Sequence, residues 1–294
     1  MSKRQFWKIR YHVSRTIARC LPDKLYLSIK FWTRFGYWMD WKHPKTFSEK
    51  LQWMKVYDRH EEYTCLVDKA AVKDYVASKI GREYIIPTIA SFNNAEEIDF
   101  DRLPLQFVLK CTHDSGGLVV CKDKKKLDFE EVRKKIRKGL KRTYVIQNRE
   151  YPYAKVPRRV IAEKFLESDS DLKDYKFYCF EGRPYCVLVC GNRSSNLTFD
   201  YFDLNWNHMP IKKGHSFSKE NLPKPQNFEK MVELATKLSE NFHFIRVDLY
   251  NVNGTIYFGE LTFFPGSGMA PFSPKEWDRT FGDLIHLPTD ENDV

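Results

Sequence analysis

The segment 244–264, FIRVDLYNVNGTIYFGELTFF, constrains the fold of this chain more than any other. Apolar and polar residues alternate on both sides of an Asn-Gly pair, which predicts two antiparallel strands joined by a tight turn. Four polar side chains lie inside the predicted strands, where a sheet facing a core carries apolar ones: Arg246, Asp248, Glu260 and Thr262. Three interpretations are open: a solvated face, a satisfied ion pair or a metal site.

The length of the turn decides whether the two carboxylates share one face of the hairpin. A two-residue turn at Asn253-Gly254 would place Asp248 and Glu260 on opposite faces, because side chains alternate along a strand. A three-residue loop that begins at Val252 would gather the polar residues on one face. Its pairs would be Arg246 with Glu260 and Asp248 with Phe258. We expect this loop, because Gly254 then stands where a left-handed backbone is required.

Two carboxylates on one face repel each other unless a positive charge lies between them. A hard divalent cation removes the repulsion, and carboxylate oxygens are ligands that magnesium prefers. The alternative is an ion pair between Arg246 and Glu260, with Asp248 in solvent. The hairpin taken alone favours the ion pair, because exposed charge pairs are common.

The composition limits the class of protein. A chain of 294 residues that is 42% hydrophobic can bury one large core or two modest ones, and its net charge of +10 suggests an anionic partner. The seven cysteines include no C-x-x-C pair, and most lie in apolar runs, which predicts reduced core residues rather than disulfides or structural zinc. Neither an apolar run of membrane-spanning length nor a signal-peptide pattern is present, so we expect a cytoplasmic protein.

The first forty residues are basic and aromatic. Six cations are interleaved with large apolar side chains: Lys3, Arg4, Lys8, Arg10, Arg15 and Arg19 with Phe6, Trp7, Ile9, Tyr11 and Ile17. This pattern suits a helix that lies peripherally on an anionic membrane at its inner face. A helix packed on the domain fits the pattern equally well.

The rest of the chain predicts helices alternating with pairs of strands. Helices are expected over 68–81 with Asp68 as cap, over 128–142 with Asp128 as cap, over 227–242, and after a cap at Ser273. Strands are expected on both sides of a glycine turn within 106–124, over 158–168, and in a hairpin over 174–191. This order indicates an α+β protein with antiparallel sheets.

Several motifs together resemble the ATP-grasp ligases. In chain order they are DK at 68–69, FVLKCTHDSGG at 107–117, AEKFLE at 162–167, and RVDLY with FGELTF over 246–263. The segments PKTFSEKLQWMKVYDR, DYKFYCFEGRP and FFPGSGMAPFSPKEWD are similar to the TupA-like branch, associated with teichuronopeptide and capsular polysaccharide biosynthesis. The resemblance covers about residues 44 to 283.

The resemblance implies two α+β subdomains whose antiparallel sheets grip ATP, preceded by a basic helical segment. It divides the chain into a basic segment 1–43, an α/β part 44–105, a small lid subdomain 106–168 and a large subdomain 169–294 with the metal site. Within the small subdomain, the flexible lid over the phosphates would be the glycine turn HDSGG at 113–117.

The resemblance also implies roles for individual residues. Lys69 and Lys110 would hold the ATP phosphates, beneath a lid that contains His113, Ser115, Gly116 and Gly117. The hinge strand would place Glu163 near the adenine ring. The backbone of Lys164, Phe165 and Leu166 would form hydrogen bonds with the edge of that ring. Asp248 and Glu260 would bind Mg²⁺, with Thr262 where the commonest pattern has asparagine, which leaves open whether one or two ions bind. Lys176, Arg246 and Arg193 would contact the transferred phosphoryl group, and His113 would orient the lid or accept a proton.

The implied reaction is ATP-dependent amide formation. ATP would phosphorylate a carboxylate, expected in a uronic acid of a polysaccharide precursor, and an amine such as an amino acid would then attack. The basic helix around 124–142 suits an acidic saccharide, and we expect no nucleic acid partner. One alternative is a glycosyltransferase of the same pathway, for which DSD at 169–171 is the one metal motif. A second is a binding protein with a degenerate ATP site.

Overall fold

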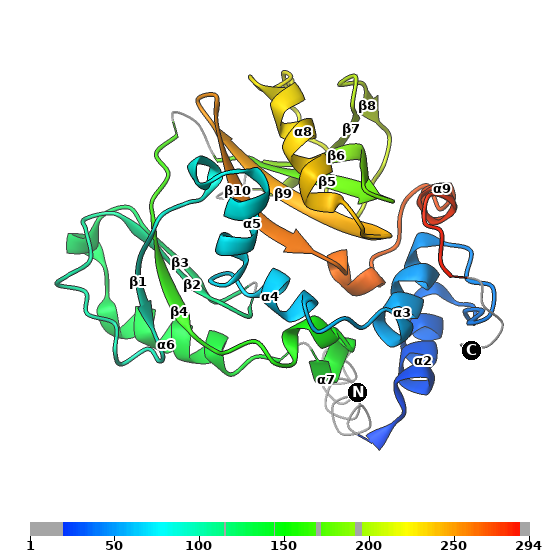
Figure 1. Ribbon diagram of the computed structural model, residues 1–294, viewed down its shortest axis with the longest axis horizontal. Coiled ribbons are helices and arrows are strands. Elements are labelled where there is room, and N and C mark those ends of the chain that lie inside the picture. Colours follow the sequence, from blue (N-terminus) through cyan, green and yellow to red (C-terminus); the bar gives the residue numbers. More distant parts are fainter. Residues whose placement is uncertain (1–19, 115, 144, 169–171, 192–195, 289–294) are drawn as a thin grey trace, which may run out of the picture.

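The strands form two antiparallel sheets that lie side by side (Figure 1). The computed structural model describes residues 20–114, 116–143, 145–168, 172–191 and 196–288. The small sheet has the order β1-β4-β2-β3, and the large sheet has the order β10-β9-β5-β6-β7-β8. The small sheet contains β1 (Thr88–Phe92), β2 (Phe107–Cys111), β3 (Leu118–Cys121) and β4 (Val160–Lys164). The large sheet contains β5 (Asp174–Phe180), β6 (Arg183–Gly191), β7 (Thr198–Asp203), β8 (His208–Met209), β9 (Phe244–Val252) and β10 (Thr255–Thr262).

Each sheet has its own core and its own covering helix. On the small sheet lies α6 (Phe129–Leu140), which buries Val132 and Ile136. Against the large sheet packs α8 (Phe228–Ser239), with α4 (Tyr63–Val67) and α5 (Val72–Ile80) between the two sheets (Figure 1). A boundary at residue 106 would separate β1 from the strands with which it forms one sheet.

Four further α-helices are described: α2 (Asp23–Phe35), α3 (Phe47–Tyr57), α7 (Val145–Asn148) and α9 (Glu276–Asp283). Of these, α3 packs against α2 and α9, and α2 is hydrogen-bonded to α7. A capping box starts α3: the Thr46 side chain accepts from the N–H of Glu49, and the Glu49 carboxylate accepts from the N–H of Thr46. Among the described residues, none of the helices is long and apolar enough to cross a membrane.

Two of the three predicted caps are wrong. Asp128 caps α6 as expected, since its carboxylate accepts from the N–H groups of Glu130 and Glu131. Asp68 instead closes a turn onto Ala70, because α5 begins at Val72. The last helix begins at Glu276, so its N-cap position is Lys275 rather than Ser273, and no side chain caps it there.

The predicted register of the opening hairpin is also wrong, although its conclusion about the faces is right. The turn has two residues, since Val252 pairs with Thr255, and Gly254 has a φ of 85° as expected. A β-bulge at Gly259 then shifts the pairing by one residue, so that Glu260 lies opposite Asp248. The short turn alone would place Asp248 and Glu260 on opposite faces of the hairpin. The one-residue shift at the bulge brings them back to the same face, so the polar side chains lie together.

The other face of the hairpin packs on the core, as predicted. Ile245, Val247 and Leu249 are fully buried within the cluster that underlies the large sheet. The five cysteines predicted to lie in the core are buried and reduced: Cys111, Cys121, Cys179, Cys186 and Cys190.

We expect Gly259→Ala to destabilise the protein by about 1–3 kcal/mol through overpacking at the bulge. A Cβ atom at Gly259 would lie 3.0 Å from the Asp248 carbonyl oxygen and 3.2 Å from the Tyr250 ring. Urea unfolding measures the loss. The matched control is Gly191→Ala in β6, whose Cβ would meet nothing closer than Thr198 Oγ1 at 3.4 Å. Equal stability of the two variants would contradict a packing constraint at the bulge.

Candidate active site

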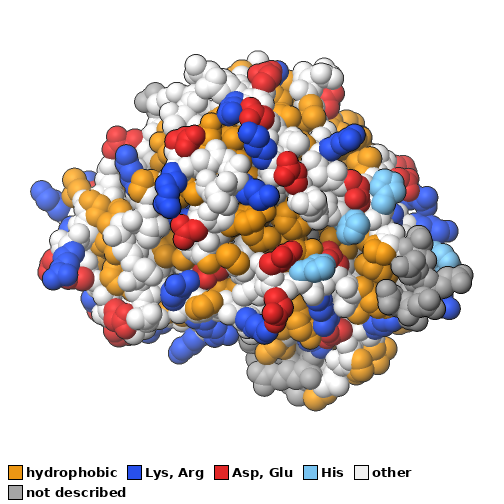
Figure 2. Space-filling view, viewed as in Figure 1, with side chains coloured by type: hydrophobic (Ala, Val, Ile, Leu, Met, Phe, Trp, Pro, Cys, Tyr) orange, Lys and Arg blue, Asp and Glu red, His pale blue; other side chains and the backbone are white. Residues whose placement is uncertain are grey.

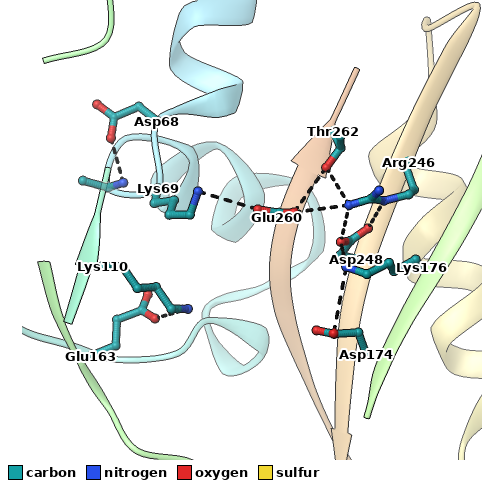
Figure 3. A network of polar contacts seen from close by, with 11 residues as sticks. Asp68, Lys69, Lys110, Glu163, Asp174, Lys176, Arg246, Asp248, Glu260 and Thr262 are labelled. Carbon is teal, nitrogen blue, oxygen red and sulfur yellow. Dashed lines mark hydrogen bonds and ion pairs between the residues drawn. The ribbon is translucent and has the colours of Figure 1, made fainter. Parts of the chain in front are cut away.

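The polar face of β9 and β10 centres on the guanidinium group of Arg246 (Figure 3). Its Nε donates to Asp248 Oδ1 at 2.6 Å and its Nη2 donates to Asp248 Oδ2 at 2.7 Å. The same Nη2 donates to Glu260 Oε1 at 3.2 Å and to Thr262 Oγ1 at 3.0 Å. Arg246 therefore joins every polar side chain that the sequence singled out on this hairpin. The expected ion pair is present, but Asp248 is buried rather than solvated.

The neighbouring strand β5 adds a second cation on the same face. Lys176 lies directly opposite Asp248 in the sheet, and its ammonium group donates to Asp248 Oδ2. Asp174, two residues earlier and therefore on the same face, has its carboxylate 4.0 Å from the Lys176 ammonium. Two cations thus hold the buried Asp248 carboxylate, which meets the requirement that buried charges be paired.

These contacts set the charge states at the hairpin. Burial alone would raise the pKa of Glu260, but Lys69, Lys176 and Arg246 outweigh it and lower the pKa to about 2. Burial alone would lower the pKa of Lys176, but the Asp248 carboxylate raises it above its ordinary value. The carboxylate is ionised and the lysine is protonated at neutral pH.

Lys69 connects the two halves of the molecule. Its ammonium group lies 3.6 Å from Glu260 Oε2 on the large sheet, and its backbone N–H donates to the carbonyl of Thr112 beyond β2. The neighbouring Asp68 accepts from Arg159 at 2.8 Å, which fixes this segment beside the small sheet. The Lys69 side chain, two residues after α4, therefore extends from the small sheet to the large sheet.

On the small sheet, a buried carboxylate holds two lysines. Glu163 of β4 lies 2.6 Å from the ammonium of Lys110 on β2 and 2.5 Å from that of Lys73 on α5. Burial alone would raise the pKa of Glu163, but the two lysines lower it below its ordinary value. The Glu163 side chain is thus paired with two cations, and its expected position near adenine stays a prediction.

The predicted lid turn lies between β2 and β3. A Cβ atom at Gly117 would lie 2.4 Å from Cys111 Sγ, so the chain has room only for glycine there. Arg142 packs against Gly116 and pairs with Asp114 at 3.0 Å. His113 is buried, and burial with the nearby Arg158 lowers its pKa. Ser115 and Arg193 lie outside the described residues.

Three cavities lie along this region. The first, of about 640 Å³, is lined by the predicted hinge residues Lys164, Phe165 and Leu166. The second, of about 230 Å³, is lined by Lys69, Lys110, Lys176, Asp248 and Glu260, with Gly117 at its edge. The third, of about 480 Å³, shares Lys69 and Glu260 with the second and adds Arg246, Thr262 and Lys30. The structure thus brings most of the predicted site residues together around two adjoining cavities, while their individual roles stay predictions.

A model of the TupA-like ATP-grasp proteins matches residues 49–286. The chain belongs to the TupA-like ATP-grasp family. Its two antiparallel sheets, with helices on their outer faces, are the ATP-grasp fold expected from the sequence. This family is one of ATP-dependent ligases.

Solved structures of ATP-grasp enzymes are similar to the chain at low identity. An L-amino acid ligase from Bacillus licheniformis shares 13% identity with a TM-score of 0.45, over 75% of this chain and 49% of that one. A D-alanine–D-alanine ligase from Bacillus anthracis, complexed with ATP, shares 15% identity with a TM-score of 0.41, over 75% and 63%. The chain therefore spans about half to two thirds of the length of these structures. The comparison with curated proteins gives no match.

The residues present fit a magnesium ion that arrives with a phosphorylated nucleotide. Among the described residues, no group of three or more acidic, histidine or cysteine side chains is placed to hold a metal. Asp248 and Glu260 nevertheless lie opposite each other and both line the second cavity. Magnesium is commonly held by one or two carboxylates together with substrate phosphates, which is the donor set available here.

Sequence reasoning missed several residues of these cavities. Asp174 lines the second cavity and precedes Lys176 by two residues, so strand spacing could have indicated it. Lys73 lines none of the three cavities, but it pairs with Glu163 beside Lys110. Lys30 and Glu150 line the third cavity from segments far away in the chain. No local pattern connects them with the hairpin.

Proposed function

We propose that this TupA-like ATP-grasp protein joins a carboxylate to an amine with ATP, forming an amide and releasing ADP and phosphate. The observation that carries the proposal is the pair of cavities that meet at Lys69 and Glu260. The second cavity, the smaller of this pair, is lined by lysines and carboxylates suited to magnesium-bound phosphates. The third cavity, the larger of this pair, has room for the substrate carboxylate that receives the phosphoryl group. Arg246 lines the larger cavity while it holds Asp248 of the smaller one.

Lys69, Lys110 and Lys176 would bind the phosphate oxygens of ATP, since each ammonium group lies at the smaller cavity. Asp248 and Glu260 would hold magnesium, which neutralises charge on the transferred phosphoryl group. Arg246 would orient the carboxylate and stabilise the charge that develops during transfer. The hinge from Lys164 to Leu166 would contact adenine in the first cavity.

The larger cavity supports an acidic saccharide as the carboxylate substrate. Lys30, Lys69 and Arg246 give it positive charge, while Tyr153 and Phe264 give it apolar wall area. A uronic acid of a surface polysaccharide precursor combines a carboxylate with a ring of suitable size.

The amine would approach from the side of the cavity that carries Glu150. This carboxylate is buried in the wall of the cavity. Burial raises its pKa, and the nearby Lys55 ammonium group offsets only part of that rise. A carboxylate with a raised pKa suits an ammonium group that must lose a proton before it attacks. An amino acid carries such a group.

Lys110→Ala should weaken ATP binding by about 1.5–3 kcal/mol, because it removes a charged donor from the phosphates. Calorimetric titration with ATP and magnesium measures the change. Lys122→Ala is the matched control, because Lys122 is exposed directly after β3 and lies outside the described cavities. Unchanged affinity in a folded Lys110→Ala protein would mean that Lys110 only neutralises Glu163.

The reaction can be trapped without knowledge of the amine. With ATP, magnesium, hydroxylamine and a uronate such as glucuronic acid or its oligosaccharides, the enzyme should release ADP and phosphate and form a hydroxamate. Hydroxylamine attacks the acyl phosphate in place of the amine. Asp248→Asn and Glu260→Gln should abolish phosphate release, because each removes one negative ligand at constant size. Glu233→Gln on the exposed side of α8 makes the same change away from the site and should have no effect.

Three outcomes would contradict the proposed ligase activity. Release of AMP and pyrophosphate would indicate an adenylate mechanism, and transfer of a sugar from a nucleotide donor would indicate the glycosyltransferase. ATP binding with no phosphate release for any uronate or amino acid probe would indicate a binding protein.

Lys30→Met should raise the KM for the uronate about tenfold or more while ATP affinity stays constant. The ammonium group of Lys30 lines the larger cavity and donates to Gln147 O at 2.6 Å and Asn148 Oδ1 at 2.8 Å. Steady-state kinetics and ATP titration separate the two effects. Lys24→Met on the same helix is the control, because Lys24 lies over the Tyr57 ring instead. An equal KM in both variants would place the acceptor elsewhere.

A further inference from the structure

Helix α2 carries an apolar stripe that faces away from the protein. Leu25, Ile29 and Trp32 follow one another at i, i+4 and i+7, and Tyr37 and Trp38 continue beyond the helix. These side chains are between 39% and 60% exposed. They are five of the nine large hydrophobic side chains that are exposed among the described residues, so the exposure is concentrated here. Figure 2 shows hydrophobic side chains at the lower right, where Figure 1 places α2.

The stripe is held in place by the opposite face of the helix. Leu27 and Phe31 are fully buried against Met39 and Met269. Polar contacts add to this packing: Arg149 pairs with Asp23 at 2.5 Å, Tyr26 donates to Gln147 O at 2.9 Å, and Arg34 donates to Met269 O at 2.9 Å. A rotation of α2 that buried the outer stripe would expose the inner one. The stripe is therefore a fixed feature of the surface.

The two tryptophans form one platform. Trp32 and Trp38 stack with ring centroids 5.6 Å apart and planes inclined by 17°. Trp and Tyr side chains are favoured at the boundary between lipid headgroups and acyl chains, where one part of the ring is wet and the other apolar. Exposed apolar patches of this kind mark interaction sites.

The charges that flank the stripe in the sequence identify its partner. Residues 1–19 lead into α2 and contain six Lys or Arg residues and no Asp or Glu. The exposed Lys42 and Lys45 follow Trp38. A second copy of the chain carries the same net charge of +10 and would be repelled, whereas an anionic lipid surface attracts Lys and Arg side chains that lie near it. Stable attachment of a peripheral protein commonly needs both signals, apolar insertion and basic charge.

We propose that the outward stripe of α2, with Tyr37 and Trp38, docks this protein on the surface of an anionic lipid bilayer. The apolar side chains enter the boundary between headgroups and acyl chains, and the flanking cations bind the headgroups. The same helix presents Lys30 to the larger cavity, so a lipid-attached acceptor would meet the enzyme beside its docking surface. That consequence rests on the proposed function, whereas the docking itself does not.

The first experiment is co-sedimentation of the full chain with phosphatidylcholine vesicles that contain 30% phosphatidylglycerol. We expect binding that falls at least tenfold without the anionic lipid or in high salt, since salt screens the cations. Trp32→Ser with Trp38→Ser should reduce binding at least tenfold, whereas Val120→Ser, an exposed apolar residue of β3, should not. Equal binding by both variants would overturn the proposal.

The second experiment locates the contact even where a serine variant folds poorly. Vesicles with brominated acyl chains should quench part of the tryptophan emission of the wild-type chain. Trp32→Phe with Trp38→Phe keeps the apolar surface, so it should still sediment with vesicles but lose most of the quenching. Unchanged quenching would place the inserted residues elsewhere. A concentration-dependent dimer that the serine variant abolishes, without vesicle binding by either protein, would assign the stripe to a second copy.

Discussion

The architecture of the site depends on the pairing of buried carboxylates with cations. Asp248 is buried on β9 of the large sheet, where an unpaired carboxylate would be strongly destabilising. Arg246 and Lys176 supply its partners from the same strand and from the adjacent strand, and both reach it because strand spacing places them on one face. Arg246 also donates to Glu260 and Thr262, so one buried cation connects the polar side chains of the hairpin.

The sequence predicted the face of the hairpin but not its register. A three-residue loop, and a two-residue turn followed by a bulge, both place Asp248 and Glu260 on the same face of the hairpin. The alternation of side chains in the sequence therefore cannot distinguish the two arrangements. A Cβ atom at Gly259 would crowd the Asp248 carbonyl oxygen at 3.0 Å, so the bulge favours glycine, but a glycine within a strand pattern has several explanations. A local pattern therefore gave the chemistry of the face, while the packing of the strands decided the pairing.

Long-range contacts account for most of what the sequence could not give. The motifs placed Lys69, Lys110, Asp248 and Glu260 near one another because they occur in a known order. They could not indicate that Glu163 would pair with Lys73 and Lys110, since this pairing depends on how α5 packs beside β4. Helix α2 is a similar case: its basic and aromatic composition was visible, but the division into a buried and an outward stripe appears only after it is fixed by Asp23, Tyr26 and Arg34.

The charge of the smaller cavity bears on how a phosphorylated ligand could bind there. Its wall carries three lysines and four carboxylates: Lys69, Lys110 and Lys176 with Asp114, Asp174, Asp248 and Glu260. These lysines are already paired with Glu260, Glu163 and Asp248, so a polyphosphate would compete with carboxylates for the same ammonium groups. Under the proposed function, any lysine that turns to phosphate leaves a carboxylate with one cation fewer, since Arg246 or Lys73 alone remains beside it. A divalent cation shared between Asp248, Glu260 and the phosphates offsets that loss, which is a physical reason for nucleotide and magnesium to bind this site together.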